Sequence, residues 1–480
     1  MVAHTAESLQ AILDHQRQAF LHEGEVKLTR RRDRLDRCIA MLRQHEDAVC
    51  EALNNDFGQR PATVTRFTDV FPALSALSYA RDNLKSWARA RHHTPRIGTW
   101  IPGAKASVVY QPIGVVGIIS PWNFPINLTF APLAGALAAG NRCMLKPSEH
   151  TPQTSELLER MVAATFDQSE VAVCTGSAAV GAAFAALPFD HLLFTGSVAV
   201  GRRVMAAAAE NLVPVTLELG GKCPVILGRS AGLKRAVDRI LLAKLLNAGQ
   251  ICLAPDYVLL PREKIDEFIK LARKWVAHSY GAPHRSQDYT SIINPQHRER
   301  LRAYLDDARS RGAEIVELGA DAGAADNPSD SQRLLPPALI IGATATMSVM
   351  REEIFGPILP LIPYDDIEAA VEFVRARPRP LALYWFGNDR AEEKAVLSHT
   401  LSGGVTINDV AMHVLIESLP FGGVGASGMG AYHGEQGFRT FSHARSIYRQ
   451  TRIDIAGLLS LRPPYTARTR RALRLLFSRL

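Results

Sequence analysis

Short apolar runs alternate with amphipathic helical patterns along most of the chain. From Ser107 onward the apolar runs are VVY, VVGIIS, CMLKP, VAVCTG, HLLFTG, VTLEL and CPVIL. Between several of them lie helix-like patterns such as TPQTSELLERMVAATF, which opens at Thr151, and SVAVGRRVMAAAAEN. Continuous apolar strands that alternate with helices predict a parallel, doubly wound sheet. Because ligands bind beyond the carboxyl ends of the strands in such sheets, we expect functional residues in the turns that follow each run.

Other stretches flank this series. Before it, the helical period predicts polar helices over Thr5 to His22 and over Thr29 to Asn54, which carry no obvious chemistry. After it, a second α/β series begins beyond Leu219 and runs to Asp409. The segment from His413 to Ser446 contains FGGVGASGMGAYHGEQGF, whose glycines predict close backbone approach rather than flexibility.

Composition indicates an ordinary globular protein of two or three packed units. The chain has 480 residues, of which 47% are hydrophobic and 21% charged. The longest uncharged stretch, Ala106 to Asn141, is interrupted by four prolines and is expected to be protein interior rather than a membrane span. The first residues carry charges where a signal peptide needs an apolar core, so we expect no export and a cytoplasmic protein.

The cysteines and the charge exclude some classes of function. Six scattered cysteines form no CxxC pair and no zinc-like spacing, which favours reduced thiols and no metal site. Much of the net charge of +8 is arginine near the ends. The run RRRDRLDR from Arg30 is interpreted as the solvated face of a helix. The run from Arg468, RTRRALRLLFSRL, has no acid; packing against a neighbouring subunit or the parent domain is favoured, with contact to an anionic membrane surface left open. No motif supports nucleic-acid binding.

The sequence NAGQICLAPD places a cysteine, Cys252, just after a helical pattern that runs from Leu233 to Asn247 and is broken by Gly249. A lone cysteine is more often a small buried hydrophobe than a nucleophile, so it needs partners. One candidate is Glu218 in VTLELGGK, at the end of an apolar strand. Burial raises the pKa of a carboxyl group toward that of a general base. A structural hydrogen bond would also explain a glutamate at this strand end.

Two further motifs carry candidate chemistry. In SPWNFP, two prolines and two aromatics stiffen the turn around Asn123, whose amide suits a developing oxyanion, although asparagines are also common in turns. In FTGSVAVG, Gly196 to Gly201 lead from a strand into a helix whose free amides could meet a phosphate. The only GxGxxG, which begins at Gly423, opens no βαβ unit.

The ordered occurrence of seven motifs resembles the aldehyde dehydrogenase superfamily. They are SPWNFP, LKPSE, FTGSVAVG, LELGGK, NAGQICLAPD, EEIFGPILP and LPFGGVGASGMG. Within it, CLAPDYVL and SGMGAYHGEQGFRTFSH resemble the class 3 branch, and LPFDHLLFTG with AAAENLVPVTLELGGK is similar to bacterial coniferyl aldehyde dehydrogenases. The resemblance implies an α/β fold with two doubly wound parallel-sheet domains. Its expected parts are a cofactor-binding domain (1–85 and 107–218), a catalytic domain (219–410), an oligomerisation and substrate-gate element (86–106 and 411–450) and a basic tail (451–480).

The resemblance also implies roles for the candidate residues. Cys252 would attack an aldehyde, and the adduct would lose a hydride and become a thioester. Asn123 and the backbone amide of Cys252 would stabilise the oxyanion, and Glu218 would activate the water that releases a carboxylic acid. The expected substrate is an aromatic aldehyde such as coniferaldehyde, or a medium-chain aliphatic one.

The same resemblance assigns cofactor positions. Lys146 and Glu149 are expected at the adenosine ribose. The pyrophosphate position is assigned to Gly196, Ser197 and Gly201, and the nicotinamide riboside position to Glu353 and Phe355. A carboxylate at Glu149 would repel a ribose phosphate and favours NAD over NADP, although class 3 relatives use both. A homodimer is expected, with His413 as a channel residue. The chain departs from the family at Ile251, which is expected to narrow the site, and at Cys223.

Three other functions remain to be weighed. A relative that passes the thioester to coenzyme A would lack the glutamate present at 218. A cysteine hydrolase with His191 or His413 as base would leave LKPSE, FTGS and EEIFGP without a purpose. A catalytically silent binding protein would have no need of Cys252, Glu218 and Asn123 together.

Overall fold

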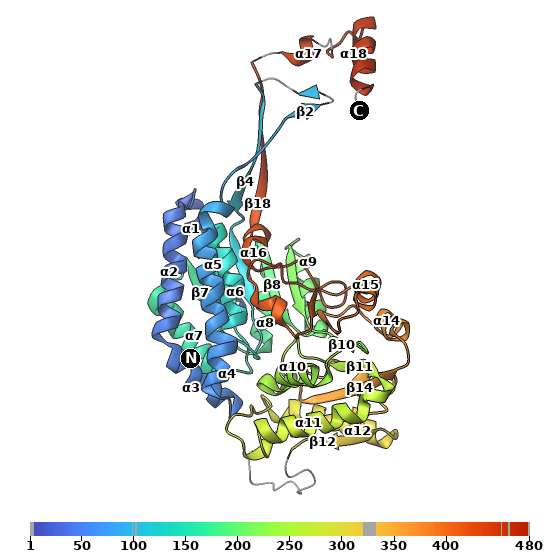
Figure 1. Cartoon of the computed structure of the whole chain (residues 1–480). Helices are drawn as coiled ribbons and strands as arrows, with labels where there is room; N and C mark the ends of the chain where they lie inside the picture. The colour runs from blue at the N-terminus through green and yellow to red at the C-terminus, as the bar shows by residue number, and fades with distance from the viewer. Residues whose placement is uncertain are drawn as a thin grey trace.

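The computed structural model describes residues 4–97, 99–100, 103–319, 333–452, 454–458 and 461–478. Two large β-sheets with helices around them form the body, and a long arm projects from it (Figure 1). Buried apolar side chains from the N-terminal helices and from strands of both sheets belong to one continuous core cluster. This shared core fixes the two sheets relative to each other.

The N-terminal region is helical. Its elements are α1 (Ala6–Glu23), α2 (Leu28–Gln44), α3 (Glu46–Phe57), α4 (Ala62–Thr65), a π-helical turn (Arg66–Val70) and α5 (Phe71–Trp87). The single helix predicted over Thr29 to Asn54 is wrong, because the chain breaks at His45 and begins α3 there. α2 and α5 pack against the buried helix α6 (Asn127–Ala139). These helices therefore cover one face of the six-stranded sheet.

The interpretation of the Arg30 run as a solvated face is also wrong in part. The side chains of Arg31 and Arg34 are buried. Nε of Arg34 donates to Glu170 at 3.0 Å and its Nη2 donates to Glu23 at 3.0 Å. Intermixed aspartates marked the outer face of this helix, but they could not show that Arg34 turns inward to a buried carboxylate and that Arg31 turns inward to the backbone oxygens of Val26 and Ala138.

The six-stranded sheet has the order β17-β9-β8-β5-β6-β7. Its strands are β5 (Val115–Ile119), β6 (Arg142–Lys146), β7 (Val171–Val173), β8 (His191–Gly196), β9 (Val215–Leu219) and β17 (Gly428–Met429). All neighbours are parallel except β17, which pairs with β9 in the antiparallel sense. The intervening helices are α6, α7 (Pro152–Thr165), α8 (Ala178–Ala185) and α9 (Val198–Ala209).

The seven-stranded sheet has the order β12-β13-β14-β11-β10-β15-β16. Its strands are β10 (Pro224–Leu227), β11 (Tyr257–Pro261), β12 (Glu314–Glu317), β13 (Ala338–Ile341), β14 (Ile358–Tyr364), β15 (Ala382–Phe386) and β16 (Gly404–Ile407). Only β12 is antiparallel to its neighbour. Its helices are α10 (Leu233–Leu245), α11 (Ile265–Ser279), α12 (Pro295–Ser310), α13 (Ser348–Arg351), α14 (Ile367–Arg375) and α15 (Arg390–His399). Two parallel α/β sheets, each with one antiparallel edge strand, confirm the predicted fold class.

The arm is a separate three-stranded antiparallel sheet of order β1-β4-β18. It consists of β1 (Arg91–His93), β4 (Lys105–Pro112) and β18 (Ser442–Arg449), with α16 (Gly434–Thr440) at its base. The VVY run therefore belongs to this antiparallel arm, which corrects its placement in the doubly wound series. At the far end lie the strand pair β2 (Arg96–Ile97) and β3 (Thr99–Trp100) and the tail helices α17 (Ile455–Leu458) and α18 (Ala467–Phe477).

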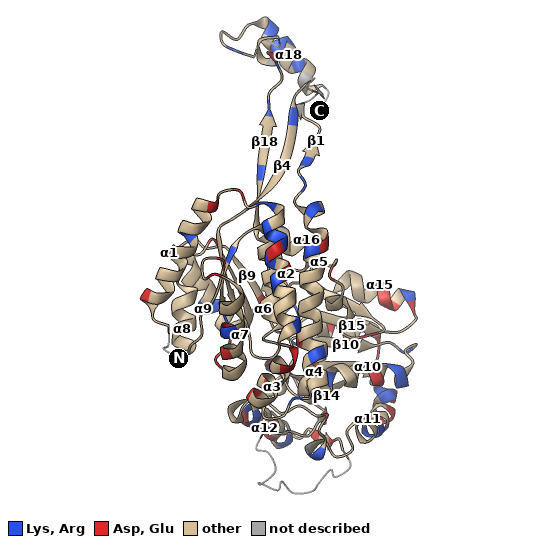
Figure 2. Ribbon diagram, turned by 90° about the vertical axis from the view of Figure 1, so that its left-hand side faces the viewer, with Lys and Arg blue, Asp and Glu red and all other residues tan. Residues whose placement is uncertain are grey.

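Lysines and arginines follow the arm and α18 (Figure 2). Residues 453, 459, 460, 479 and 480 of the predicted basic tail lie outside the described residues. None of the helices within the described ranges is long and apolar enough to cross a membrane. The uncharged stretch from Ala106 to Asn141 contains β5 and α6, both largely buried, as expected for protein interior.

Candidate active site

The candidate residues lie where the edges of the two sheets meet. In the six-stranded sheet they follow strand ends: the Asn123 turn follows β5, Lys146 ends β6, Gly196 ends β8 and Glu218 lies in the last residues of β9. In the seven-stranded sheet they precede the strands, with Cys252 before β11 and both Glu353 and Phe355 before β14. The candidates of the first sheet thus lie at or beyond the ends of their strands, whereas those of the second sheet precede their strands. The chain crosses directly from the first sheet to the second through the loop between β9 and β10.

A left-handed turn precedes the candidate nucleophile. α10 ends at Leu245, and the three residues Asn247, Ala248 and Gly249 have φ of 51°, 51° and 73°. The helix predicted to continue to Asn247 thus ends earlier, and Gly249 is not the residue that breaks it. A side chain at Gly249 would collide with the backbone of Gly356. Such strained backbone is typical of functional sites, where the surroundings hold it in place.

Cys252 presents a partly exposed but poorly solvated thiol. Burial, followed by the nearby carboxylates of Glu353 and Glu218, raises its pKa to about 12. At neutral pH the thiol is therefore protonated, and it needs a base to become a nucleophile. Behind it, the buried Cys223 donates a hydrogen bond from Sγ to the backbone oxygen of Cys252 at 3.4 Å. Cys223 thus supports the nucleophile loop.

Glu218 is buried without a partner. Its side chain is 3% exposed, and within the described part of the chain neither carboxylate oxygen has a hydrogen-bond partner. Burial raises its pKa well above the usual value. A buried carboxylate without compensation is costly, so a structural hydrogen bond does not explain this residue. The glycine-rich segment lies across it, because Gly428 of β17 pairs with Glu218.

Asn123 lies against the nucleophile loop. Its Nδ2 donates to the backbone oxygen of Gln250 at 3.2 Å, and its side chain is 3% exposed. Gln250 is itself held, since its Nε2 donates to the oxygens of Asn247 and Ser291 at 2.9 and 3.0 Å. Sequence reasoning missed Asn247 and Gln250, although the NAGQ that precedes the cysteine was the available signal.

The turn that carries Asn123 is also held from the N-terminal region. Nη1 of Arg60 donates to the backbone oxygen of Asn123 at 2.9 Å. Arg60 in turn pairs with Asp69 in a fully buried ion pair. Arg60 lies in the loop between α3 and α4, and Asp69 lies in the π-helical turn, so both are outside the two helices predicted over Thr5 to His22 and Thr29 to Asn54. No local motif around Arg60 or Asp69 pointed to this contact.

The predicted cofactor residues line the carboxyl edge of the six-stranded sheet. Nζ of Lys146 donates to the oxygen of Pro147 at 2.7 Å and lies 3.7 Å from the Glu149 carboxylate. Ser197 caps α9 and accepts a hydrogen bond from the amide of Val200 at 3.3 Å. A Cβ at Gly201 would meet the side chain of Leu219 at 2.6 Å, so any larger residue would require Leu219 to shift.

This edge fits a dinucleotide phosphate. The N-terminus of α9, a helix of 12 residues, supplies backbone amides and a positive dipole. The hydroxyl of Thr195, at the end of β8, is buried and without a partner among the described residues. The ammonium and carboxylate at Lys146 and Glu149 can bond ribose hydroxyls. Donors, acceptors and a close backbone approach are therefore all present.

Glu353 and Phe355 lie close to the catalytic candidates. A Cβ at Gly220 would overlap the Glu353 carboxylate, which also accepts a hydrogen bond from the backbone amide of Gly221. Burial, followed by the nearby charge of Asp256, raises the pKa of Glu353 to about 8. Phe355 adopts φ of 50°, in the left-handed region, and its ring lies 5.3 Å from that of Trp122 at a steep angle.

The histidines proposed as bases of a hydrolase are poorly placed. His191 opens β8, so roughly 13 Å of strand separate it from Thr195 beside Glu218. Its Nε2 shares a hydrogen bond with Thr216 at 2.9 Å. His413 is bonded through Nδ1 to Thr406 at 2.8 Å and lies over Gly404. Burial lowers the pKa of both rings to about 4.

The described residues contain no group of histidine, cysteine and acidic side chains that could hold a metal ion. The candidate site consists of the Cys252 thiol, the buried Glu218 carboxylate and the Asn123 amide on one side. On the other side is the edge of the six-stranded sheet that fits a dinucleotide. These features define the class of a cysteine-dependent oxidoreductase on a two-sheet α/β fold.

Comparisons with known proteins name the family. Residues 1–447 match the Aldehyde dehydrogenase family. The chain is 49% identical over 461 residues to the coniferyl aldehyde dehydrogenase of Pseudomonas sp. (strain HR199), covering 96% of this chain and 94% of that protein. The solved substrate-bound state of Staphylococcus aureus AldH matches with a TM-score of 0.90 and 36% identity, over 98% of this chain and 99% of that one. The NAD+ complex of a Mycobacterium tuberculosis aldehyde dehydrogenase matches with a TM-score of 0.84 and 27% identity, over 95% and 92%.

The chain belongs to the aldehyde dehydrogenase family. It is an NAD(P)-dependent oxidoreductase that acts on aldehydes. The seven ordered motifs thus led to the correct family. The resemblance of this chain to bacterial coniferyl aldehyde dehydrogenases is confirmed at the level of sequence similarity.

Proposed function

We propose that this enzyme oxidises an aromatic aldehyde of the coniferaldehyde type to its carboxylic acid through a covalent adduct on Cys252. The single observation that carries the mechanism is the buried, unpartnered carboxylate of Glu218, which is electrostatically coupled to the Cys252 thiol. A raised carboxylate pKa and a protonated thiol together form a base and nucleophile pair.

The first step is attack of the thiol on the aldehyde carbon. Glu218 accepts the thiol proton, the sulfur–carbon bond forms, and the aldehyde oxygen becomes an oxyanion. The side-chain amide of Asn123 and the backbone amide of Cys252 stabilise this charge. The Asn123 amide carries two N–H donors, of which one is used by the Gln250 oxygen and one remains for the oxyanion.

The bound NAD(P) supplies the hydride acceptor. Lys146 and Glu149 bind the adenosine ribose, while Gly196, Ser197 and Gly201 place the α9 amides toward the pyrophosphate. Glu353 holds the nicotinamide ribose, and Phe355 orients the ring. The carboxylate at Glu149 favours NAD over NADP, because it repels a phosphate on the ribose.

The second half of the reaction is hydrolysis of the thioester. Once the proton taken from the thiol has been released to solvent, Glu218 removes a proton from the attacking water, and collapse of the adduct returns the electron pair to the Cys252 sulfur and releases the acid. A coenzyme A-acylating enzyme would have no need of this base. The unpartnered Glu218 therefore supports hydrolysis.

The aromatic substrate is supported by similarity and by the character of the site. The Pseudomonas relative is named for coniferyl aldehyde. Trp122 and Phe355 form an edge-to-face pair at the site, and Phe421 stacks on His433 at 5.2 Å in the glycine-rich segment. Such rings suit a planar aromatic substrate. Ile251, directly before the nucleophile, narrows the approach of the substrate to the Cys252 thiol. The alternative to an aromatic substrate is a medium-chain aliphatic aldehyde.

The remaining assignments concern domains and assembly. The cofactor-binding unit consists of 1–85 and 107–218, except that 107–112 belong to β4 of the arm. The catalytic unit consists of 219–410, the gate and oligomerisation element of 86–106 and 411–450, and the tail of 451–480, with His413 near the channel. A homodimer is supported by the arm, which exposes the apolar side chains of Ile447 and Tyr448. The basic tail packs against the partner subunit, and anionic lipid is its alternative partner. Six free cysteines support a reducing compartment such as the cytoplasm.

The test is NADH production by the purified protein with matched aromatic and aliphatic aldehydes. Coniferaldehyde should give the highest kcat/KM, Cys252→Ala should abolish turnover, and added coenzyme A should not accelerate it. A panel with no turnover, or full activity in Cys252→Ala, would overturn the mechanism. A higher kcat/KM with aliphatic aldehydes would overturn only the substrate assignment.

A further inference from the structure

A fully buried ion pair lies beneath the turn that carries Asn123. Nη2 of Arg60 is 2.5 Å from Oδ2 of Asp69, and both side chains are 0% exposed. Removing two charges from water is costly, and such pairs often stabilise a protein less than apolar residues of similar size would. The pair therefore calls for an explanation other than stability.

Both partners also contact the same turn, although Nη2 of Arg60 donates to the hydroxyl of Thr68 at 2.9 Å as well and its Nε has no partner among the described residues. Nη1 of Arg60 donates to the backbone oxygen of Asn123 at 2.9 Å. Oδ1 of Asp69 accepts from the backbone amides of Ile126 and Asn127, at 3.0 and 3.3 Å. The ion pair thus forms hydrogen bonds to the turn at two places, at Asn123 itself and at the start of α6.

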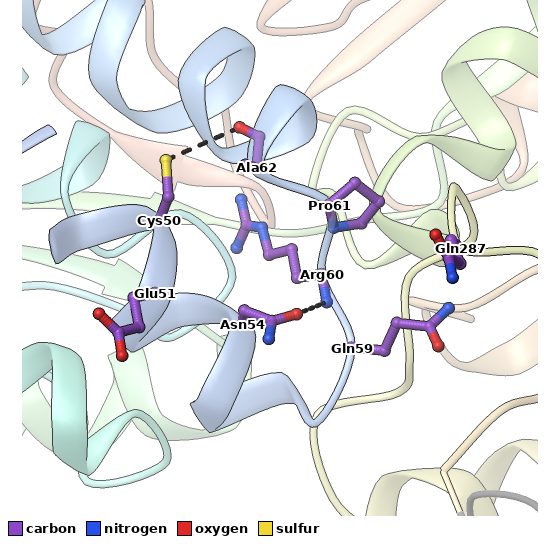
Figure 3. A pocket seen from close by; sticks show the side chains of 8 residues that line it. All are labelled: Cys50, Glu51, Asn54, Gln59, Arg60, Pro61, Ala62 and Gln287. Atoms are coloured by element: carbon purple, nitrogen blue, oxygen red, sulfur yellow. Dashed lines mark hydrogen bonds between the residues drawn. The ribbon is translucent and has the colours of Figure 1, made fainter. Parts of the chain in front are cut away.

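The guanidinium group is itself held from several sides. The backbone amide of Arg60 donates to Oδ1 of Asn54 at 2.9 Å, and the side chain extends away from Gln59 and Gln287 (Figure 3). The rings of Phe57 and Phe124 flank it at 4.8 and 5.4 Å. These contacts leave the guanidinium little freedom to move relative to the turn.

Asp69 lies on an unusual piece of helix. It belongs to the π-helical turn Arg66–Val70, between α4 and α5. Single π-turns within α-helices are rare and often occur at functional sites. Here the wider turn places the carboxylate between Arg60 and the first amides of α6.

The same carbonyl connects the turn to the nucleophile loop. Nδ2 of Asn247 lies 3.4 Å from the backbone oxygen of Asn123 and 3.3 Å from that of Gln250. The Asn123 carbonyl is therefore a shared acceptor for Arg60 and for the strained segment before Cys252. A displacement of this carbonyl would move the Asn123 side chain relative to the thiol.

We infer that Arg60 and Asp69 are positioning residues that hold the Asn123 amide in the orientation needed to receive the oxyanion. This inference rests on the proposed role of Asn123 as an oxyanion donor. Its physical basis is that a fixed donor needs no reorganisation when charge develops, whereas a donor that swings loses much of that benefit. Neither residue touches the substrate.

The first test is Arg60→Lys. Lysine keeps a positive charge opposite Asp69, but a single ammonium does not reproduce the planar fork that reaches both Asp69 and the Asn123 oxygen. We expect kcat to fall about tenfold, a fraction of the loss for a deleted oxyanion donor. KM for the aldehyde and the dissociation constant of NAD should change little. The matched control is Arg34→Lys, which alters a buried ion pair with Glu170 far from the turn and should keep kcat.

The decisive test is a double-mutant cycle with Asn123→Ala. If Arg60 acts through Asn123, Arg60→Lys should have no further effect on kcat in the Asn123→Ala enzyme. Independent, multiplicative losses would overturn the inference, as would equal losses for Arg60→Lys and Arg34→Lys. Full activity of Asn123→Ala alone would instead refute the oxyanion role itself. If Arg60→Lys does not fold, the double variant Arg60→Met with Asp69→Asn removes both charges together and enters the same cycle.

Discussion

The side-chain amide of Asn123 donates a hydrogen bond to the backbone oxygen of Gln250, two residues before Cys252, at 3.2 Å. This bond joins the turn after β5 to the loop before β11, and so connects the two sheets at the candidate site. The proposed oxyanion donor and the proposed nucleophile are thereby joined by a direct hydrogen bond between their two segments. Their relative position is preorganised before the aldehyde arrives.

Asn123→Ala should lower kcat by about 10²- to 10³-fold, the loss usual for an oxyanion-hole donor. The aldehyde KM should change much less, because the lost bond forms only with the charged adduct. Steady-state kinetics at saturating NAD measure both values, and the melting temperature shows whether the fold is intact. A folded variant with the kcat of the wild type would refute the role of Asn123.

Glu218→Gln should be more stable than the wild type above the ordinary pKa range of a carboxyl group. The pKa of Glu218 is raised in the folded protein, so the folded state binds its proton more tightly than the unfolded state. Stability therefore falls as pH rises from the unfolded pKa of 4.5 to the raised folded pKa, and glutamine removes this loss. Melting temperatures across this pH range should diverge, with the variant higher. If the melting temperatures of the two proteins follow the same pH dependence, ionisation of Glu218 does not lower the stability of the folded protein.

Gly220→Ala should weaken NAD binding. A Cβ at this position would overlap the Glu353 carboxylate, which then has to leave its place beside the Gly221 amide. We expect the dissociation constant of NAD to rise about tenfold, as for the loss of one hydrogen bond. The matched control is Gly232→Ala, where no atom lies within 4 Å of the new Cβ. Equal effects of the two substitutions on NAD binding would contradict the role of Glu353.

Glu149→Gln should increase the use of NADP. The substitution removes the negative charge that repels a ribose phosphate while keeping the side-chain length. Because the side chain is 37% exposed, salt screens the repulsion, and we expect a several-fold gain in kcat/KM for NADP. The comparison is the ratio of kcat/KM for the two cofactors at fixed ionic strength. A ratio that does not change would remove Glu149 from cofactor selection.

Local patterns predicted the elements that position the cofactor. The strand HLLFTG and the helix after Ser197 are present as β8 and α9, and the helix opening at Thr151 is present as α7. Apolar runs and cap residues act over a few neighbouring positions, so one sequence shows them directly. Glu218 was also visible, because an acid at the end of a buried apolar strand is rare without a purpose.

Contacts between distant segments were not predictable in the same way. Arg60 reaches Asn123 across 63 residues, and Arg34 reaches Glu170 across 136. A helical period indicates which face of α2 is buried, but it does not show which carboxylate from a distant segment contacts that face. The left-handed turn at Asn247 was missed for a related reason: the α10 pattern continues through it, and the close approach of the Gly356 backbone to Gly249 comes from a distant segment.

The most direct test of the central claim is mass spectrometry of the Glu218→Gln enzyme after mixing with NAD and coniferaldehyde. Glutamine removes the base of both steps, so acylation should be slower, but hydrolysis should stop at the thioester and NADH formation should level off at one equivalent per active site. The peptide that contains Cys252 should carry the acyl group of the substrate. The same burst of NADH with an unmodified Cys252 peptide, or an adduct on another cysteine, would contradict the account.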